Sequence, residues 1–319
     1  MPEFHVSVLA RQLCDAVVPA IDAHPDQTVV DATCGAGGHT HAILQRSRPA
    51  RVILLDQDPA ALAHAKTRLS GADCPIEFRQ ARFSALDAVL DELNIPQISV
   101  LIADIGVSSH QLDTGARGFS FREDAPLDMR MDPTAGRTAA QVLETIEVGE
   151  LADLLRRYGE EPEARRVAAA IVAARPTTTG ALASVVENAM SGRARRLLGK
   201  RIHPATRTFQ ALRIFVNREL EELDALLEHG PARLCVGGRM AVISFHSLED
   251  RRVKRRFTAL TRAPELPRGL PMTAAELPRA SFAIPAGFPR RGAQADQDEL
   301  DRNPRSRSAR LRVIERVMP

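Results

Sequence analysis

The sequence predicts an α/β fold in which a mostly parallel sheet is interrupted by a long, mostly helical insert. The first hundred residues alternate short apolar runs with helical patterns, which is typical of βαβ units. The apolar runs that end at Asp104 and begin at Arg239 look like consecutive strands, yet they lie much farther apart than one crossover needs. With 319 residues and 44% hydrophobic composition, the chain is long enough to bury a substantial core around such a sheet.

The elements of the sheet follow from local patterns. Strands are predicted at residues 28–32, 51–56, 76–79, 98–104 and 239–245, and residues 311–317 could close the sheet as a last strand. Residues 98–104 are the clearest, because this run is too apolar for a half-exposed strand. A glycine turn after the first strand leads into a helix that ends near Gln45. Asp58 and Pro59 are typical of a helix N-cap and first helical position, and they predict a helix to about Leu69. Gly237 and Gly238 are expected to introduce the fifth strand.

The insert is predicted to span residues 113–203 and to project over the carboxyl ends of the strands, where open α/β sheets bind ligands. Residues 148–158 and 163–174 show the clearest helical periodicity, and residues 176–180 form a break. A single long helix should follow the insert, because apolar residues step by three and four at Phe209, Leu212, Val216, Leu220, Leu223 and Leu227. The Pro-, Arg-, Ala- and Gly-rich residues 261–308 predict a long irregular excursion.

Composition argues against a membrane protein and against a zinc site. No apolar stretch reaches the roughly 18 to 20 residues that cross a bilayer, and residues 1–5 lack the layout of a signal peptide, so we expect a cytoplasmic protein without membrane contacts. The four cysteines are scattered, with no CxxC pair and no Cys/His spacing that suits a metal. We therefore predict reduced thiols and no bound metal.

Positive charge is concentrated in three segments, although the formal net charge is only +3. Residues 192–218 carry eight basic side chains and no acidic one, residues 251–256 are almost all basic, and the third segment contains six arginines between residues 302 and 316. Such clusters often form solvated helix faces. Three of them in a chain with a nucleotide-type site favour a nucleic-acid partner, because basic patches neutralise phosphates.

A glycine turn at residues 35–38 lies directly between a predicted strand and a helix, and glycine lets a ligand lie against the backbone. Asp56 ends the next strand, where a carboxylate can accept hydrogen bonds from both hydroxyls of an adenosine ribose. The pair indicates an adenosine cofactor, either NAD or S-adenosylmethionine. The loop does not fit G-x-G-x-x-G, and Asp31 suits the cationic methionyl amine but would repel a pyrophosphate, so we favour S-adenosylmethionine.

Longer motifs give a family resemblance that runs nearly end to end. They are DATCGAGGH at 31–39, DIGVSS at 104–109, GFSF at 118–121, PLDMRMDP at 126–133, HPATRTFQ at 203–210 and SFHSLEDR at 244–251. With these motifs the chain resembles the bacterial family of 16S rRNA cytosine-N4 methyltransferases (RsmH, also called MraW). The resemblance implies a class I (Rossmann-like) methyltransferase sheet formed by residues 1–112 and 204–319, with an insert at 113–203 that recognises RNA.

The resemblance also implies a cofactor site and a substrate. Gly37, Gly38 and His39 would line the cofactor loop together with Gly35 and Asp31, Asp56 would hold the ribose, and Phe83 would lie by the adenine. Asp104 and Gln111 would complete the pocket. The implied activity is S-adenosylmethionine-dependent N4-methylation of a specific cytosine in the decoding (P-site) region of 16S rRNA, with the small ribosomal subunit as partner.

Transfer to an exocyclic amine is a direct displacement that depends on alignment and needs no covalent enzyme intermediate. Asp104, at the end of the fourth strand, is the candidate acceptor for the amino hydrogens. Many amino-methyltransferases carry an (Asp/Asn/Ser)-Pro-Pro-aromatic motif at this place, which residues 104–107 do not match, so a role in cofactor binding alone is equally open. A cytosine-C5 enzyme would need a cysteine nucleophile near the fourth or fifth strand, and Cys34 lies in the cofactor loop instead.

A target base must leave its stack, and aromatic faces usually hold it. The chain has no Trp and a single Tyr, so Phe119 and Phe121 in the insert and Phe245 are the candidate platforms, although phenylalanines more often belong to a core. Candidate polar contacts to RNA are His203, Arg207, Asn217, His246 and Ser247.

Two other functions compete with RNA methylation. One is methylation of a protein or small molecule, which would depend little on salt. The other is a non-enzymatic RNA-binding or assembly factor, against which the intact loop and Asp56 argue. A homodimer is one of the oligomeric states that the sequence allows.

Overall fold

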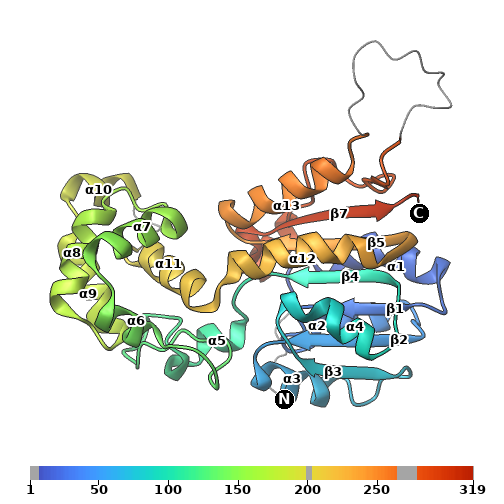
Figure 1. Ribbon diagram of the computed structural model, residues 1–319, viewed down its shortest axis with the longest axis horizontal. Coiled ribbons are helices and arrows are strands. Elements are labelled where there is room, and N and C mark those ends of the chain that lie inside the picture. The colour runs from blue at the N-terminus through green and yellow to red at the C-terminus, as the bar shows by residue number, and fades with distance from the viewer. Residues whose placement is uncertain (1–6, 199–202, 264–278, 319) are drawn as a thin grey trace, which may run out of the picture. The chain divides into compact units, whose positions relative to one another are not determined.

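The computed structural model describes residues 7–198, 203–263 and 279–318. Met1–Gly106 together with Glu222–Pro319 form one compact unit, and Val107–Glu221 form a second (Figure 1). The boundaries predicted for the insert, residues 113 and 203, both lie inside the second unit, because helix α11 (Thr206–Asn217) packs against helices of that unit. The N-terminal residues 1–5 and two cations of the first basic segment, Lys200 and Arg201, lie outside the described residues.

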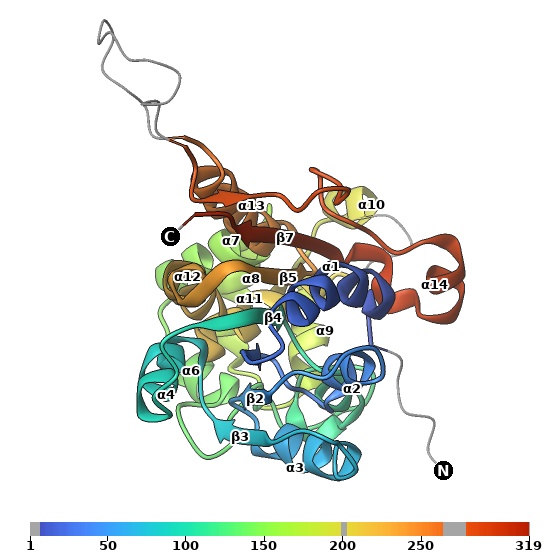
Figure 2. The same cartoon turned by 90° about the vertical axis from the view of Figure 1, so that its right-hand side faces the viewer.

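The first unit contains a seven-stranded sheet in the order β3-β2-β1-β4-β5-β7-β6 (Figures 1 and 2). Strands β1 to β5 are parallel to their neighbours, whereas β7 is antiparallel to β5 and to β6. Their bounds are β1 (Thr28–Asp31), β2 (Arg51–Asp56), β3 (Ile76–Gln80), β4 (Ile98–Asp104), β5 (Leu234–Ser244), β6 (Phe282–Ala283) and β7 (Arg310–Arg316). The predicted α/β fold class is confirmed.

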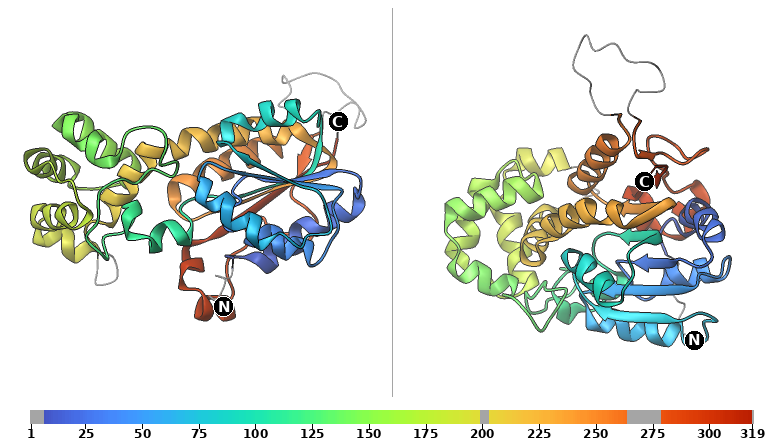
Figure 3. Two further views of the ribbon diagram at one scale, coloured as in Figure 1. Left: turned by 90° about the horizontal axis from the view of Figure 1, so that it is seen from below. Right: turned by 45° about the vertical axis from the view of Figure 1, so that its right-hand side comes forward.

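Helices cover both faces of the sheet, as alternation along the strands requires (Figure 3). Val29 packs into a cluster with α1 (Ala10–Ala23), α2 (Gly38–Leu44) and α3 (Pro59–Arg68). Val30 packs into the opposite cluster, which includes side chains of α4 (Leu86–Glu92), α12 (Glu219–Arg233) and α13 (Ser247–Leu260). The predicted cap of α3 is confirmed, since the Asp58 carboxylate accepts the Ala60 N–H at 3.0 Å.

Strand β5 begins five residues earlier than predicted, and Gly237 and Gly238 lie inside it. The register against β4 shifts between Ile98 and Val100 at this point. Gly237 has a φ of +83°, and a Cβ on Gly238 would lie only 3.0 Å from the Ser99 carbonyl oxygen. The glycine pair therefore forms an irregularity within a paired strand rather than a turn before it.

The single long helix predicted across residues 209–227 is wrong, because the structure has two helices there. Arg218 adopts a left-handed conformation with a φ of +54° and ends α11. The apolar stripe is accordingly divided: Phe209 and Leu212 are buried in the second unit, and Leu223 and Leu227 belong to the core of the first unit. Periodicity continues through the break, so it gave no signal of the boundary.

The irregular excursion predicted for residues 261–308 holds only in part. Its described residues contain β6, the helix α14 (Gln297–Arg302) and a 3-10 turn, η3 (Pro304–Ser308), while residues 264–278 are not described. Strand β6 is the strand that the sequence pattern did not locate. It has only two residues, too few to produce an alternating pattern.

The second unit is helical, in agreement with the periodicity of its sequence (Figure 1). Besides α11, its elements are α5 (Ser109–Asp113), η2 (Gly115–Arg117), α6 (Ala139–Thr145), α7 (Val148–Gly159), α8 (Ala164–Ala174), α9 (Thr179–Ala189) and α10 (Gly192–Leu198). The helices predicted at 148–158 and 163–174 are confirmed. The break predicted at 176–180 is shorter, because α9 already begins at Thr179. None of the helices in the described part of the chain has the length and apolar character to cross a bilayer.

We predict that Gly230→Ala destabilises the protein. Gly230 lies in α12 above β4, and an added Cβ would lie 2.5 Å from Cδ2 of the fully buried Leu101. Overpacking of this kind costs about 1 to 3 kcal/mol, which equals or exceeds the gain of about 1 kcal/mol in helix propensity. Urea unfolding followed by circular dichroism measures the difference.

The matched control is Gly149→Ala in α7, where nothing lies within 4 Å of the added Cβ. Its free energy of unfolding should stay equal or rise. Equal stability of the two variants would contradict the close approach of α12 to the sheet.

Candidate functional site

Three aspartates lie at the carboxyl edge of the sheet, where β1, β2 and β4 end. The register pairs Asp31 with Leu54 of β2 and with Ile102 of β4. Asp56 and Asp104 are each two residues farther along and therefore flank the loop that follows Asp31. Because β2 and β4 lie on opposite sides of β1, this edge is the switch point at which open α/β sheets bind ligands.

The loop after β1 is held by both neighbouring strands. The Cys34 N–H donates to the Leu55 carbonyl, and the Ala32 N–H donates to the Ile102 carbonyl. Gly35 and Gly37 have φ values of +50° and +73°, which favour glycine at both positions. A Cβ on Gly38 would lie only 2.0 Å from Ser7 Oγ. Backbone conformation thus favours glycine at positions 35 and 37, and a Cβ at position 38 would require the Ser7 side chain to move.

Asp56 lies at the end of β2, and its carboxylate is held in place from both sides. One oxygen accepts the Gly35 N–H at 2.8 Å, and the other accepts the Asp58 N–H at 2.9 Å. Each carboxylate oxygen can accept more than one hydrogen bond, so both keep capacity for a hydroxyl donor. Burial raises the pKa of Asp56 to about 6, with smaller contributions from the charges of Asp58 and Asp31, although the two N–H donors oppose the shift.

Asp31 is engaged by the protein itself, so the predicted contact with a methionyl amine gains no support from its surroundings and stays a prediction. Its side chain is fully buried. One oxygen accepts the Thr33 N–H at 3.1 Å and the other accepts the Thr40 hydroxyl at 2.8 Å. Burial raises the pKa of Asp31, although the charge of His39 and the two hydrogen bonds act in the opposite direction. Asp31 therefore holds the loop and the start of α2 in place.

His39 links the cofactor loop to Asp104. Its Nε2 lies 3.1 Å from Asp104 Oδ2, and its ring is buried. Burial lowers the pKa of His39, but the hydrogen bond to Asp104 and the charges of Asp104 and Asp31 outweigh that effect, and the pKa is raised overall. The Asp104 N–H also donates to Thr33 Oγ1 at 2.6 Å, so β4 and the loop are joined through both backbone and side chain.

Phe83 and Gln111 are the two remaining predicted cofactor residues, and their contacts with a cofactor stay predictions. Phe83 follows β3 in the 3-10 turn η1 (Phe83–Ala85) and packs against the core cluster that contains Val30. Gln111 belongs to the second unit and is buried. Its Oε1 accepts the Ser108 N–H, and Ser108 Oγ accepts the Gln111 N–H, so the two residues form the capping box of α5.

The second unit brings together only some of the predicted RNA contacts. The Phe121 ring centroid lies 4.5 Å from that of His203 and 4.9 Å from that of Phe209. Phe119 is buried, as expected for a core phenylalanine.

Asn217 and Arg207 are engaged within the second unit. Asn217 is buried and bonds to the backbone of Met129 and Met131, so it clamps that loop instead of presenting its amide to a ligand. Arg207 is half-buried and donates to the Glu160 carbonyl.

His246 and Ser247 lie in the first unit, where β5 passes into α13. His246 Nε2 is 3.0 Å from the buried Glu249 Oε1, and Glu249 Oε2 accepts the Phe245 and His246 N–H groups. Ser247 is exposed at the first turn of α13. This corner is one strand away from Asp104, because Asp104 pairs with Ile243 of β5.

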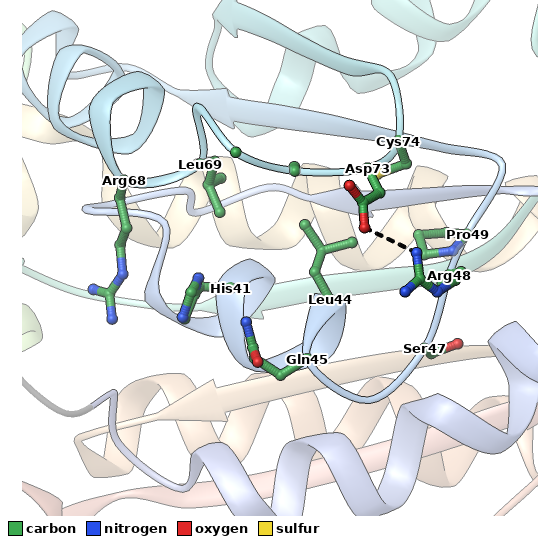
Figure 4. A pocket seen from close by; sticks show the side chains of 12 residues that line it. His41, Leu44, Gln45, Ser47, Arg48, Pro49, Arg68, Leu69, Asp73 and Cys74 are labelled. Atoms are coloured by element: carbon green, nitrogen blue, oxygen red, sulfur yellow. Dashed lines mark hydrogen bonds and ion pairs between the residues drawn. The ribbon is translucent and has the colours of Figure 1, made fainter.

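Neither a separate cavity, nor a metal site, nor a reactive cysteine offers an alternative to this site in the described residues. A cavity of about 220 Å³ lies between α2, α3 and the following loop, and its lining includes none of the predicted cofactor residues (Figure 4). Among the described residues, no group of His, Cys, Asp and Glu side chains is arranged to hold a metal. Burial raises the pKa of the Cys34 thiol, which opposes formation of the thiolate that a cytosine-C5 mechanism needs.

Sequence reasoning missed three participants. Thr33 and Thr40 hold Asp31, and Thr33 also ties the loop to Asp104. Their positions between two acidic strand ends were a usable signal, since hydroxyls commonly satisfy buried carboxylates. Phe209 had been interpreted only as part of an apolar stripe.

We predict that S-adenosylmethionine binding weakens as pH falls through about 6. The pKa of Asp56 in the folded protein lies above its ordinary value. The folded state therefore binds its proton more tightly than the unfolded state does, and the free energy of unfolding falls as pH rises from about 4 to 6. A ribose needs the ionised form of Asp56, so the Kd should rise about tenfold per pH unit below 6. Isothermal titration calorimetry between pH 5 and 8 measures this, and Asp56→Asn should remove the dependence. Persistence of the slope in the variant would assign it to another group.

Comparisons with known proteins agree with the geometry. The family model described as "MraW methylase family" matches residues 3–317. Proteins named "Ribosomal RNA small subunit methyltransferase H" from Thiobacillus denitrificans and Azoarcus sp. are each 47% identical, over 99% and 98% of this chain and 98% and 96% of their own lengths. One of the same name from Halorhodospira halophila is 48% identical over 96% of this chain and 93% of its own. The predicted class, a methyltransferase that uses S-adenosylmethionine, is confirmed, and the chain belongs to the MraW methylase family.

Proposed function

We propose that this protein transfers a methyl group from S-adenosylmethionine to N4 of a specific cytosine in the decoding (P-site) region of 16S rRNA. The printed names of relatives that are 47% identical over nearly the whole chain support a ribosomal RNA substrate in the small subunit. The sequence motifs support the choice of base and position. A ribosomal substrate would make the protein cytoplasmic.

The observation that carries the choice of an amino group is the state of the Asp104 carboxylate. Its Oδ2 is engaged by His39. Its Oδ1 is buried and, among the described residues, has no hydrogen-bond donor. A buried acceptor without a donor costs free energy unless a ligand supplies one. An exocyclic amine carries two N–H donors and would satisfy this atom.

The residues at the edge divide the work. The bound cofactor supplies an electrophilic methyl group. The glycine loop and Asp56 would hold its nucleoside part, with the two Asp56 oxygens on the two ribose hydroxyls. Alignment of the amine with the methyl group can contribute on the order of 7 to 11 kcal/mol in the best intramolecular systems.

Asp104 would act on the amine itself. Cytosine N4 is a poor nucleophile because its lone pair is delocalised into the ring. A carboxylate that accepts an amino hydrogen draws the nitrogen toward a pyramidal geometry and can hold the proton that is lost when the new N–C bond forms. The pairing with His39 fixes the orientation of Asp104.

The second unit would supply recognition of the RNA. Its basic segment around α10 and α11 contains exposed arginines such as Arg193, Arg195 and Arg196, which suit phosphates. The half-buried Phe121 and the exposed His203 would offer ring faces to a base. We retain Arg207 in this role and assign Asn217 to the loop that it clamps.

The first test maps the product. Small subunits that lack the modification are incubated with the protein and radiolabelled S-adenosylmethionine, and the RNA is digested and analysed by mass spectrometry. We expect one equivalent of label on N4 of one decoding-region cytosine, and no label on subunits that already carry the modification. Label on C5, or on protein, would overturn the proposal.

The second test separates catalysis from cofactor binding. Asp104→Asn should lower kcat by about 10²-fold or more, with less than a threefold change in the Kd for S-adenosylmethionine, since Asn keeps the hydrogen bond to His39 but loses the charge. Single-turnover methylation and calorimetry measure the two quantities. Asp73→Asn, at an exposed ion pair with Arg48, is the control with an equal charge change and should keep full activity. Full turnover with unchanged cofactor affinity in Asp104→Asn would remove Asp104 from catalysis.

A further inference from the structure

We propose that a groove on the first unit, between α13 and the turn at residues 284–292, binds a phosphodiester group of the RNA substrate outside the reaction site. The inference rests on the proposed function and adds a second place where the first unit contacts the polynucleotide. It assigns a role to the second basic segment, residues 251–256, which the cofactor site does not use.

The groove has a volume of about 40 Å³, enough for a small polar group. Lys254 lines it from α13, and Arg290 lines it from the turn. Thr258 adds a hydroxyl group, whereas the Thr261 hydroxyl donates to the Phe257 carbonyl at 2.8 Å, and Phe257 and Phe288 add apolar surface. Two exposed cations and one hydroxyl donor around a shallow hollow suit a phosphate with charged oxygens.

Two of the three basic side chains that line the groove are not neutralised by the protein. Lys254 and Arg290, with the adjacent Arg255 and Arg291, are exposed, and within the described residues their side chains have no acidic partner. The third, Arg312, bonds to both oxygens of Asp250. The exposed four therefore leave a net positive patch that favours a polyanion.

The turn that carries Arg290 and Arg291 is firmly held. Phe288 packs against the core, and Ala293 exchanges two hydrogen bonds of 2.9 Å with Leu311 of β7. Gly292 has a φ of +85°, and a Cβ there would lie 2.8 Å from the Leu311 carbonyl oxygen. A turn whose backbone is already ordered loses little conformational entropy when it binds a ligand, unlike basic residues on an unstructured segment.

The position of α13 favours RNA over a free anion. The helix starts at Ser247, directly after β5, whose Ile243 pairs with Asp104. The groove residues of this segment run from Lys254 to Thr261, which at 1.5 Å per residue lie roughly 10 to 21 Å along the helix axis from Ser247. A polynucleotide that presents a base at Asp104 has phosphates within that distance, whereas a single free phosphate gains nothing from it.

The experiment compares wild-type protein with Lys254→Ala/Arg290→Ala. We expect the KM for small subunits lacking the modification to rise about tenfold, with kcat at saturation and the Kd for S-adenosylmethionine unchanged. The slope of log affinity against log salt should become shallower by about 1.5, close to 0.7 to 0.9 for each lost phosphate contact. Lys254→Glu/Arg290→Glu should enlarge both effects.

The control is Arg46→Ala/Arg48→Ala, which removes the same charge from exposed arginines that are paired with Asp15 and Asp73. It should leave the KM and the salt slope as in wild type. Equal effects of the two double variants, or a fall in kcat without a change in KM, would overturn the proposal. Altered inhibition by inorganic phosphate with an unchanged KM for subunits would show that the groove takes free phosphate only. Absence of methylation by the wild-type protein would instead refute the proposed function.

Discussion

The buried carboxylate of Asp31 is the constraint on which the candidate active site depends. A charge in this environment is costly unless hydrogen bonds and an opposite charge offset it. Thr33, Thr40 and the nearby His39 do so, and each of them thereby acquires a fixed position. His39 then orients Asp104, so the cofactor loop and the candidate acceptor belong to one network. Loss of any one member should therefore alter both the conformation of the cofactor loop and the orientation of Asp104.

Much of the sheet could be predicted because its central strands are buried on both faces. Continuous apolar runs located β1, β2 and β4, and the cap at Asp58 located the start of α3. The edge strand β3 alternates apolar and polar residues and is only partly buried. The errors arose where periodicity carries no information. Arg218 adopts a left-handed conformation and divides an otherwise regular apolar stripe. A glycine pair looks the same in the sequence whether it precedes a strand or, as in β5, lies inside it. Strand β6 is too short for any pattern.

The positions of the site's glycines and strand-end aspartates could be predicted, whereas the partners of its polar side chains could not. Glycines and strand-end aspartates are marked by their place in the chain, and the structure gives them the expected positions around β1 and β2. Whether a polar side chain faces a ligand or the backbone depends on tertiary packing, which local sequence does not encode. Asp31 and Asn217 both turned inward for that reason.

The antiparallel pairing of β5 with β7 has a consequence for biosynthesis. Strand β5 ends at Ser244 and its partner begins at Arg310, so 65 residues must be translated in between. At 5 to 20 residues per second this takes roughly 3 to 13 s. During that interval the nascent sheet exposes an unsatisfied edge, which invites intermolecular pairing. The domain would be most vulnerable to aggregation, and most dependent on chaperones, in that window.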